Sequence, residues 1–135
     1  MDYRVYTLPH SSQSYETVGD WKVKRGKLRE IKVSDMKNEE YAFLVAFHEQ
    51  IEVMLCIKRG ITQKMVDSFD KQYEKAREKG IKAPCGCRPT KTSEPGHDRH
   101  APYKKEHCYA EMMERMLAKE MGVCWEDYNK TVNAL

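Results

Sequence analysis

The fold is decided by the stretch Tyr41-Ala42-Phe43-Leu44-Val45-Ala46-Phe47-His48-Glu49-Gln50-Ile51-Glu52, which continues into an apolar run over residues 53–57. This composition predicts a helix that is apolar nearly all round and is therefore buried. Within it, His48, Glu49 and Glu52 are costly to bury unless each meets a charge, a hydrogen bond or a metal ion. The sequence therefore predicts a specific partner for these side chains inside the fold, and a metal ion is the simplest one.

The elements on either side of this stretch indicate the fold class. The long helix is expected over 38–59, a second over 62–79 with Thr62 as its N-cap, a third over 102–121 and a short one over 125–134. Residues 1–35 read as a β region with strands near 3–7, 21–23 and 28–33, the last two forming a hairpin. Residues 81–101 are expected to form a long loop. We therefore expect a single α+β domain over 1–135, with a small N-terminal antiparallel sheet packed on three main α-helices.

Composition bears on several classes of protein. Charged residues make up 33% of the 135 residues, the mean hydropathy is −0.82 and the formal charge is +3. No apolar run approaches the roughly 20 residues of a membrane span, and the N-terminus lacks a hydrophobic signal region. We therefore expect a cytoplasmic protein with no membrane partner. The small charge leaves nucleic-acid binding unsupported. Five cysteines, an odd number, favour reduced thiols over a disulfide framework.

Two helices carry the residues that indicate a metal site. His48 and Glu52 are four residues apart and share one helix face, while His107, Glu111 and Glu114 recur at i, i+4 and i+7 on the third helix. Packed together, these helices would bring two imidazoles and several carboxylates into one pocket. We expect His48, Glu52 and His107 to be the metal ligands. Such a mixed nitrogen and oxygen site suits Zn, Mn, Fe or Mg, with zinc favoured.

Carboxylates near these ligands have expected roles of their own. Glu49 points about 100° away from His48 around the helix, so it can serve as a general base without being a ligand. Five further carboxylates are expected to support the site: Asp67, Asp70, Glu94, Glu111 and Glu114. The Glu94-Pro95-Gly96 segment reads as a tight turn that could present Glu94 toward the helices. In the alternative interpretation, the buried His and Glu are structural and pair with each other, with Arg115 or with Lys58.

The His-Glu-x-x-Glu spacing also invites comparison with the His-Glu-x-x-His helix of zinc peptidases. There two histidines hold the zinc ion and the Glu between them is the base. Here Glu52 occupies the place of the second histidine, which argues against peptidase activity and leaves a peptidase remnant as an alternative.

The long loop contains a second candidate metal site. Cys85 and Cys87 precede His97 and His100, so the loop offers two thiolates and two imidazoles, enough for a closed tetrahedral zinc site. Zinc fingers usually place two or more residues between paired cysteines, and here there is one. The alternative is a flexible polar loop whose cysteines are incidental.

Several motifs together resemble a group of small, uncharacterised proteins encoded by bacteriophages and prophages. The resemblance covers nearly the whole chain and rests on Pro9-His10, residues 15–21 (YETVGDW), residues 33–36, the His48-Glu49 helix with Glu52 and Cys56, Gly60-Ile61, Val66-Asp67 with Phe69-Asp70, Glu94-Pro95-Gly96, Ala101-Pro102-Tyr103 with His107, and Gly122-Val123 with Trp125 and Tyr128. It implies a phage setting, in the cytoplasm of the infected host cell, and no particular activity.

The residues favour a metal-dependent hydrolase, with a nucleotide or another phosphoester as the expected substrate. Two rival functions use the same buried polar residues. A non-catalytic counter-defence protein, built as a homo-oligomer, could sequester a host signalling nucleotide or bind a host protein. In that case Arg and Lys side chains of the loop would hold the phosphate.

Overall fold

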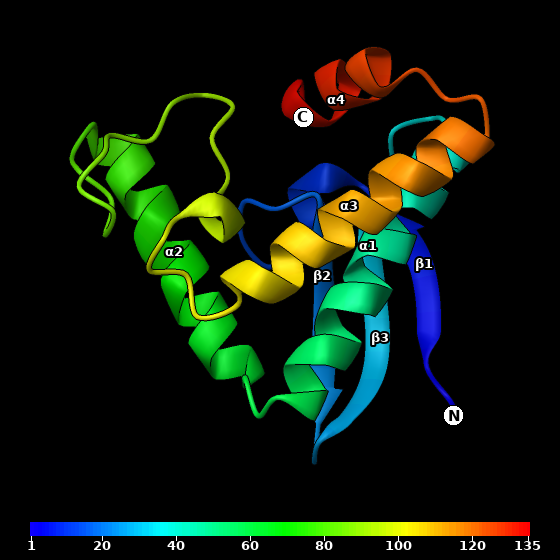
Figure 1. Ribbon diagram of the computed structural model, residues 1–135, viewed down its shortest axis with the longest axis horizontal. Coiled ribbons are helices and arrows are strands. Elements are labelled where there is room, and N and C mark those ends of the chain that lie inside the picture. Colours follow the sequence, from blue (N-terminus) through cyan, green and yellow to red (C-terminus); the bar gives the residue numbers. More distant parts are fainter.

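The computed structural model describes residues 1–135 and contains a three-stranded sheet and four α-helices, which confirms the predicted α+β class (Figure 1). The strands are β1 (Arg4–Leu8), β2 (Gly19–Lys24) and β3 (Lys27–Ser34). The helices are α1 (Glu39–Lys58), α2 (Gln63–Lys79), α3 (Lys104–Glu120) and α4 (Trp125–Asn133), with short 3-10 turns η1 (His10–Ser12) and η2 (Pro95–His97). Helix α3 begins two residues later than predicted.

The sheet has the strand order β1-β3-β2 and is mixed, whereas the sequence predicted an antiparallel sheet. Strands β2 and β3 form the predicted antiparallel hairpin, but β1 pairs with β3 in parallel. The chain reverses twice, over residues 9–18 and at Arg25-Gly26, so β3 runs in the same direction as β1. Because β3 lies between the other two strands, its pairing with β1 has to be parallel.

Strand β3 supplies the centre of the sheet and much of the core. Leu28, Ile31 and Val33 are all buried, although Leu28 and Ile31 are three residues apart and simple alternation would place them on opposite faces. An irregularity in the pairing with β2 lies between these two residues, where Lys22 pairs with Glu30 and Val23 with Leu28. The extra residue in β3 turns both apolar side chains to the same side, as a β-bulge does.

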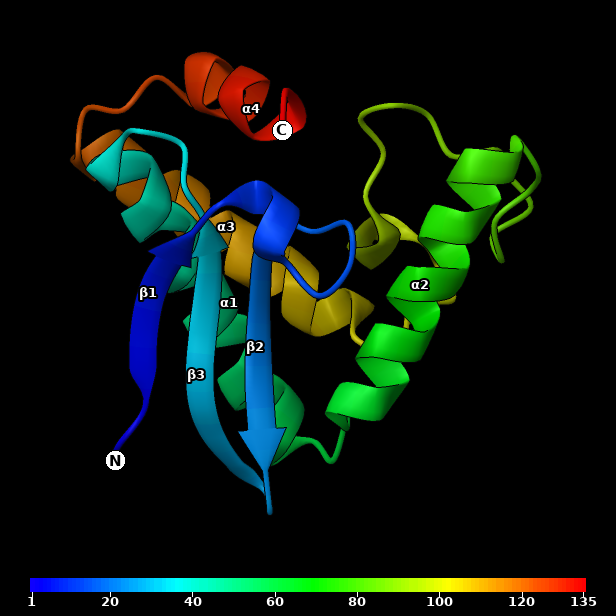
Figure 2. The same cartoon turned by 180° about the vertical axis from the view of Figure 1, so that it is seen from behind.

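Helix α1 packs on one face of the sheet and α3 packs across α1 on the same side, while no helix covers the other face (Figures 1 and 2). Helix α2 stands beside the sheet on the side of β2. Side-chain caps fix where the helices start: Asn38 accepts a hydrogen bond from the Tyr41 N–H, and Thr62 accepts one from the Met65 N–H. Gly80 ends α2 in the left-handed conformation, with φ of 63°.

Helix α1 is less completely buried than its composition predicted. Leu44, Val53 and Cys56 are fully buried against the sheet, but Phe43 is 55% exposed and Met54 is 46% exposed on the opposite side. The sheet and α3 together cover only part of the helix circumference, so an all-round apolar sequence leaves some apolar side chains at the surface.

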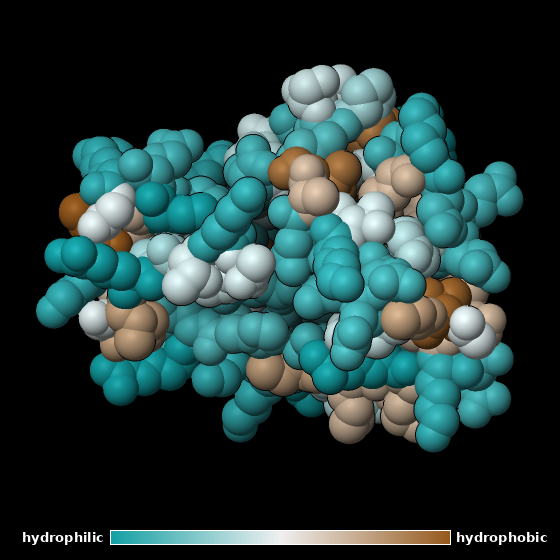
Figure 3. All heavy atoms as spheres, turned by 90° about the horizontal axis from the view of Figure 1, so that it is seen from above, coloured by the Kyte–Doolittle hydropathy of each residue, from teal (hydrophilic) through white to brown (hydrophobic).

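The face seen in Figure 3 is largely hydrophilic, with hydrophobic side chains in small separate patches. None of the helices combines the length and apolar character needed to cross a bilayer.

Candidate metal centre

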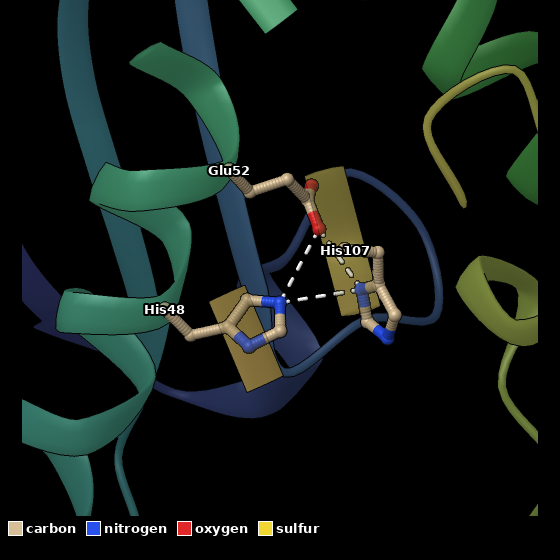
Figure 4. A group of neighbouring side chains, drawn as sticks. All are labelled: His48, Glu52 and His107. Atoms are coloured by element: carbon tan, nitrogen blue, oxygen red, sulfur yellow. Dashed lines mark hydrogen bonds and ion pairs between the residues drawn. The ribbon is translucent and has the colours of Figure 1, made fainter. Parts of the chain in front are cut away.

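The packing of α1 against α3 brings three predicted ligands to one point. His48 and Glu52 project from successive turns of α1, and His107 projects from the first turns of α3 (Figure 4). His48 Nε2 lies 3.2 Å from Glu52 Oε2 and 3.2 Å from His107 Nδ1, and His107 Nδ1 lies 2.9 Å from Glu52 Oε2. We call this group of three side chains the triad.

The size of the triad matches the needs of a metal ion. Zinc binds imidazole nitrogen and carboxylate oxygen at about 2.0–2.2 Å, so two ligand atoms in a tetrahedral site lie about 3.3 Å apart. The three donor-to-donor distances of 2.9, 3.2 and 3.2 Å are close to this value. The spacing of the triad therefore suits three of the four corners of a tetrahedral metal site.

Each histidine of the triad uses its second ring nitrogen to contact a carboxylate. His48 Nδ1 lies 2.8 Å from Glu114 Oε2 on α3, and His107 Nε2 lies 3.0 Å from Glu94 Oε2 in the loop. A carboxylate that accepts the N–H of a ligating histidine fixes the ring orientation and makes the other nitrogen a better ligand. The expected turn at Glu94 thus does bring its side chain to the helices. Two of the five supporting carboxylates, Glu94 and Glu114, contact the triad directly.

Two aromatic residues complete the surroundings of the triad. The Trp21 Nε1–H of β2 donates to Glu52 Oε1 over 3.3 Å, which leaves Oε2 directed at the histidines. The Tyr128 hydroxyl of α4 donates to Glu114, which holds His48. The sequence gave no indication that either residue has a role at this site.

Two glycines make room for functional side chains. A Cβ atom at Gly96 would lie 2.3 Å from Cγ of His107, and one at Gly19 would lie 2.4 Å from Oε1 of Glu49. Neither contact is sterically allowed, so the backbone of η2 and of β2 can approach these side chains only because both residues are glycines. The sequence showed both glycines, inside Glu-Pro-Gly and Val-Gly-Asp, but not the side chains that they accommodate.

The charges of the cluster favour a cation at its centre. Burial alone would lower the pKa of His48, but hydrogen bonds with Glu114 and Glu52 outweigh burial and raise it well above the usual value. Burial also opposes the rise in the pKa of His107 to about 10, which the hydrogen bonds with Glu52 and Glu94 produce. Burial would raise the pKa of Glu52, yet the two histidines hold it at about 2. The carboxylates thus require positive charge, which protons or a metal ion can supply.

Glu49 differs from the other carboxylates near the triad. It is partly buried, lies next to His48 in the chain and lines the cavity described below, but no hydrogen bond or ion pair engages its carboxylate. Burial, followed by the nearby charge of Glu52, raises its pKa well above the usual value. Glu49 is therefore free to exchange a proton with a molecule in the cavity.

The remaining supporting residues stand apart from the triad. Glu111 Oε2 lies 3.0 Å from His97 Nε2 at the surface, and Asp67 lines the cavity from α2. Asp70 accepts hydrogen bonds from the hydroxyls of Tyr15 and Tyr103, and burial raises its pKa to about 7. None of the three carboxylates touches a residue of the triad.

Asp70 makes a testable contribution to the pH dependence of stability. Its folded-state pKa lies above the ordinary value near 4, so its contribution to stability is full below about pH 4 and is lost as the pH rises toward about 7. Urea unfolding at pH 5 and pH 8 should show that Asp70→Asn loses less stability over this interval than the parent protein. Equal losses in the two proteins would contradict the assignment.

The structure does not bring the four residues of the second candidate site in the loop close enough to share an ion. His97 pairs with Glu111, and the groups of side chains placed closely enough to share an ion include neither cysteine. Cys85 Sγ accepts a hydrogen bond from the Cys87 N–H over 3.4 Å, and the Cys85 N–H donates to Asp98. The chain makes a local turn at the single residue between the cysteines, and Asp98 accepts the hydrogen bond of the Cys85 N–H. The thiols and the imidazoles remain apart. His97 instead joins Glu94 and His107 in a second, more exposed group.

A cavity of about 490 Å³ opens onto the triad. Its walls come from β2, from the inner faces of α1, α2 and α3, from the loop near Glu94 and from α4. All three members of the triad and Glu49 line it. A cavity of this size accommodates a small ligand or a few residues of a larger one.

Comparisons of the chain with models of known protein families, with curated proteins and with solved structures gave no match.

The role of Glu94 can be tested without changing a ligand. Glu94→Ala removes the carboxylate that contacts His107 Nε2, and loss of such a partner typically weakens metal binding by about 10–100-fold. Glu78→Ala is the matched control, because Glu78 lines the same cavity but contacts no ligand. Competition with a chelating dye measures both affinities. Equal affinities for the two variants would show that Glu94 does not orient His107.

Proposed function

We propose that the protein is a metal-dependent hydrolase whose ion is held by His48, Glu52 and His107. The observation that carries the proposal is the triad itself, in which three donor atoms lie 2.9–3.2 Å apart and both histidines are backed by carboxylates. A purely structural pairing of His and Glu does not require three donors to face a common centre beside a cavity. Three protein ligands with an open fourth position are typical of catalytic zinc sites, since structural sites are usually closed by four.

The position of His107 changes how the His-Glu-x-x-Glu segment is understood. In the sequence, Glu52 stands where zinc peptidases have their second histidine, which argued against peptidase chemistry. In the structure, α3 supplies a second imidazole, so the donor set becomes two histidines and one glutamate. This is the donor set of several catalytic zinc sites in peptidases. The missing histidine is thus replaced from another helix.

Glu49 is the group that would act as general base and then general acid in the reaction. An ion held by the triad would polarise the scissile bond and lower the pKa of a bound water. Glu49 would accept a proton from the attacking water and pass it to the leaving group, so that one water is consumed and the substrate bond is cleaved. Its carboxylate has no competing hydrogen bond and lines the same cavity as the three members of the triad.

The charge of the cavity favours an acyl substrate over the phosphoester that the sequence suggested. Eleven Asp and Glu side chains line the cavity, against two Lys or Arg. Of those two, Arg77 already donates to Glu74 and to the carbonyl oxygens of Thr90 and Ser93. An anionic phosphate would meet strong repulsion, with only Lys91, an exposed residue of the loop, left to balance it. An uncharged amide or ester bond avoids this cost.

Two measurements on the purified protein test the proposal. Elemental analysis should find a divalent metal at about one ion per chain, in keeping with a single triad. Neutral fluorogenic amides and esters should be hydrolysed by the metal-loaded protein and not after chelation, while a nitrophenyl phosphodiester should be a poor substrate. A protein that binds no divalent ion under any loading condition would refute the proposal.

A further inference from the structure

One wall of the cavity is formed by the free edge of the sheet. Strand β2 is the edge strand, with β3 on one side only, and α2 stands beside it (Figure 2). Residues of both elements line the cavity. The Val18 carbonyl accepts a hydrogen bond from the Ser34 N–H of β3, whereas the Val23 N–H turns the other way and donates to Gln63 of α2. Backbone groups alternate in direction along a strand. The N–H and C=O of Trp21 therefore point to the free edge, where no strand pairs with them.

The opposite wall of the cavity is formed by α2, which carries acidic residues at helical spacing. Asp67, Asp70, Glu74 and Glu78 recur at intervals of three and four residues along α2, and all four line the cavity. Asp70 is held by two tyrosine hydroxyls and Glu74 by Arg77. Asp67 has no ion-pair partner within contact distance, although Lys71 and Lys32 lie near enough to act on its charge, and burial still raises its pKa. It lies near the start of α2, where Gln63 of the helix contacts Val23 of β2.

We infer that the substrate is an extended polypeptide segment that pairs with the free edge of β2 and directs a Lys or Arg side chain at Asp67 and the acidic face of α2. The inference rests on the proposed function, since it names the substrate of the same site. Pairing with a sheet edge gives a peptide its backbone hydrogen bonds, and neighbouring pockets select its side chains. Trp21 has unpaired backbone groups at this edge, and its indole N–H also donates to Glu52 of the triad. A peptide on that edge therefore passes directly beside the triad.

Charge explains why the peptide should be basic. The chain as a whole carries a formal charge of +3, yet eleven of the 34 residues that line its cavity are acids and only two are Lys or Arg, so negative charge is concentrated there. A cavity lined by one sign of charge attracts ligands of the other sign and rejects those of its own. A lysine or arginine of the peptide would give Asp67 the direct ion pair that Lys71 and Lys32 do not make with it.

Binding of labelled octapeptides to the full-length Glu49→Gln protein tests the inference without requiring turnover. The peptides differ only at one central position, which is Lys, Ala or Glu, and fluorescence anisotropy measures their affinities. We expect the Lys peptide to bind more tightly than the Glu peptide by on the order of tenfold or more. Asp67→Asn should remove most of this preference. Asp127→Asn, the same change at an exposed position of α4 outside the cavity, should keep it.

Peptides with a single N-methylated amide test the pairing with β2. Only every second amide of a paired strand faces its neighbour, so methylation should weaken binding at alternate positions and leave the positions between them unaffected. A uniform response to methylation, or equal affinity for the Lys and Glu peptides, would overturn the inference. If neutral amides are nevertheless hydrolysed, the proposed function stands without it. If Lys peptides bind in the alternating pattern but no metal is found, the binding site stands and the proposed hydrolase fails.

Discussion

Replacing Glu49 with Gln is expected to give a folded, metal-loaded protein whose hydrolysis rate falls on the order of 10²-fold or more. The amide keeps the shape of the side chain, so it still fits against Gly19, where the available space is narrow. It cannot accept a proton, and the structure offers no hydrogen bond of Glu49 whose loss would destabilise the fold. Steady-state rates on the best amide substrate measure the loss of activity, and elemental analysis measures whether the metal is retained.

Glu40→Gln is the control for this change, because Glu40 lies exposed in the first turn of the same helix. It should keep the parent rate. If Glu49→Gln folded, held its metal and hydrolysed the substrate at the parent rate, Glu49 would not be the base. If the variant failed to fold, the carboxylate would be a structural partner, and circular dichroism with thermal unfolding distinguishes this outcome from a loss of chemistry.

Replacing His48 with Ala is expected to abolish stoichiometric metal binding. The change removes one of three donors and also leaves the buried carboxylates of Glu52 and Glu114 without their shared partner. In the parent protein, metal at 100–1,000 times its dissociation constant should stabilise the fold by about 2.7–4.1 kcal/mol, because the ion binds the folded chain. This stabilisation should be absent in the variant. Native mass spectrometry and unfolding with and without metal check both statements.

Two further variants strengthen the metal test. His107→Ala removes a ligand from the other helix, α3, and should lose the metal as His48→Ala does. With two variants, the test remains possible if one of them is too unstable to purify. Lys58→Ala changes an exposed residue at the end of α1 and should retain a full complement of metal. Unchanged metal content in either histidine variant would leave the triad as a structural network of ion pairs.

The sequence determined the helices and the members of the triad. The predicted bounds of α1 and α2 agree with the structure to within one residue. They came from helical periodicity and from the capping residues Asn38, Thr62 and Gly80, which are local properties of the chain. The cost of burying His48 and Glu52 in an apolar helix marked them as residues that require partners. The matching pattern on α3 indicated His107, and Glu-Pro-Gly indicated that Glu94 turns toward the helices.

Only the tertiary structure decided the direction of β1, the partners of the triad and the character of the cavity. These depend on residues far apart in the chain: Trp21 reaches Glu52, Tyr128 reaches Glu114, and α2 places its acidic face opposite β2. The same holds for the loop, where Cys85 and Cys87 have suitable chemistry but His97 is drawn to Glu111. Local patterns show which side chains need a partner. Which partner each one meets depends on how the helices pack on the sheet, since a pairing between residues 14 to 66 positions apart leaves no periodic signal in the sequence.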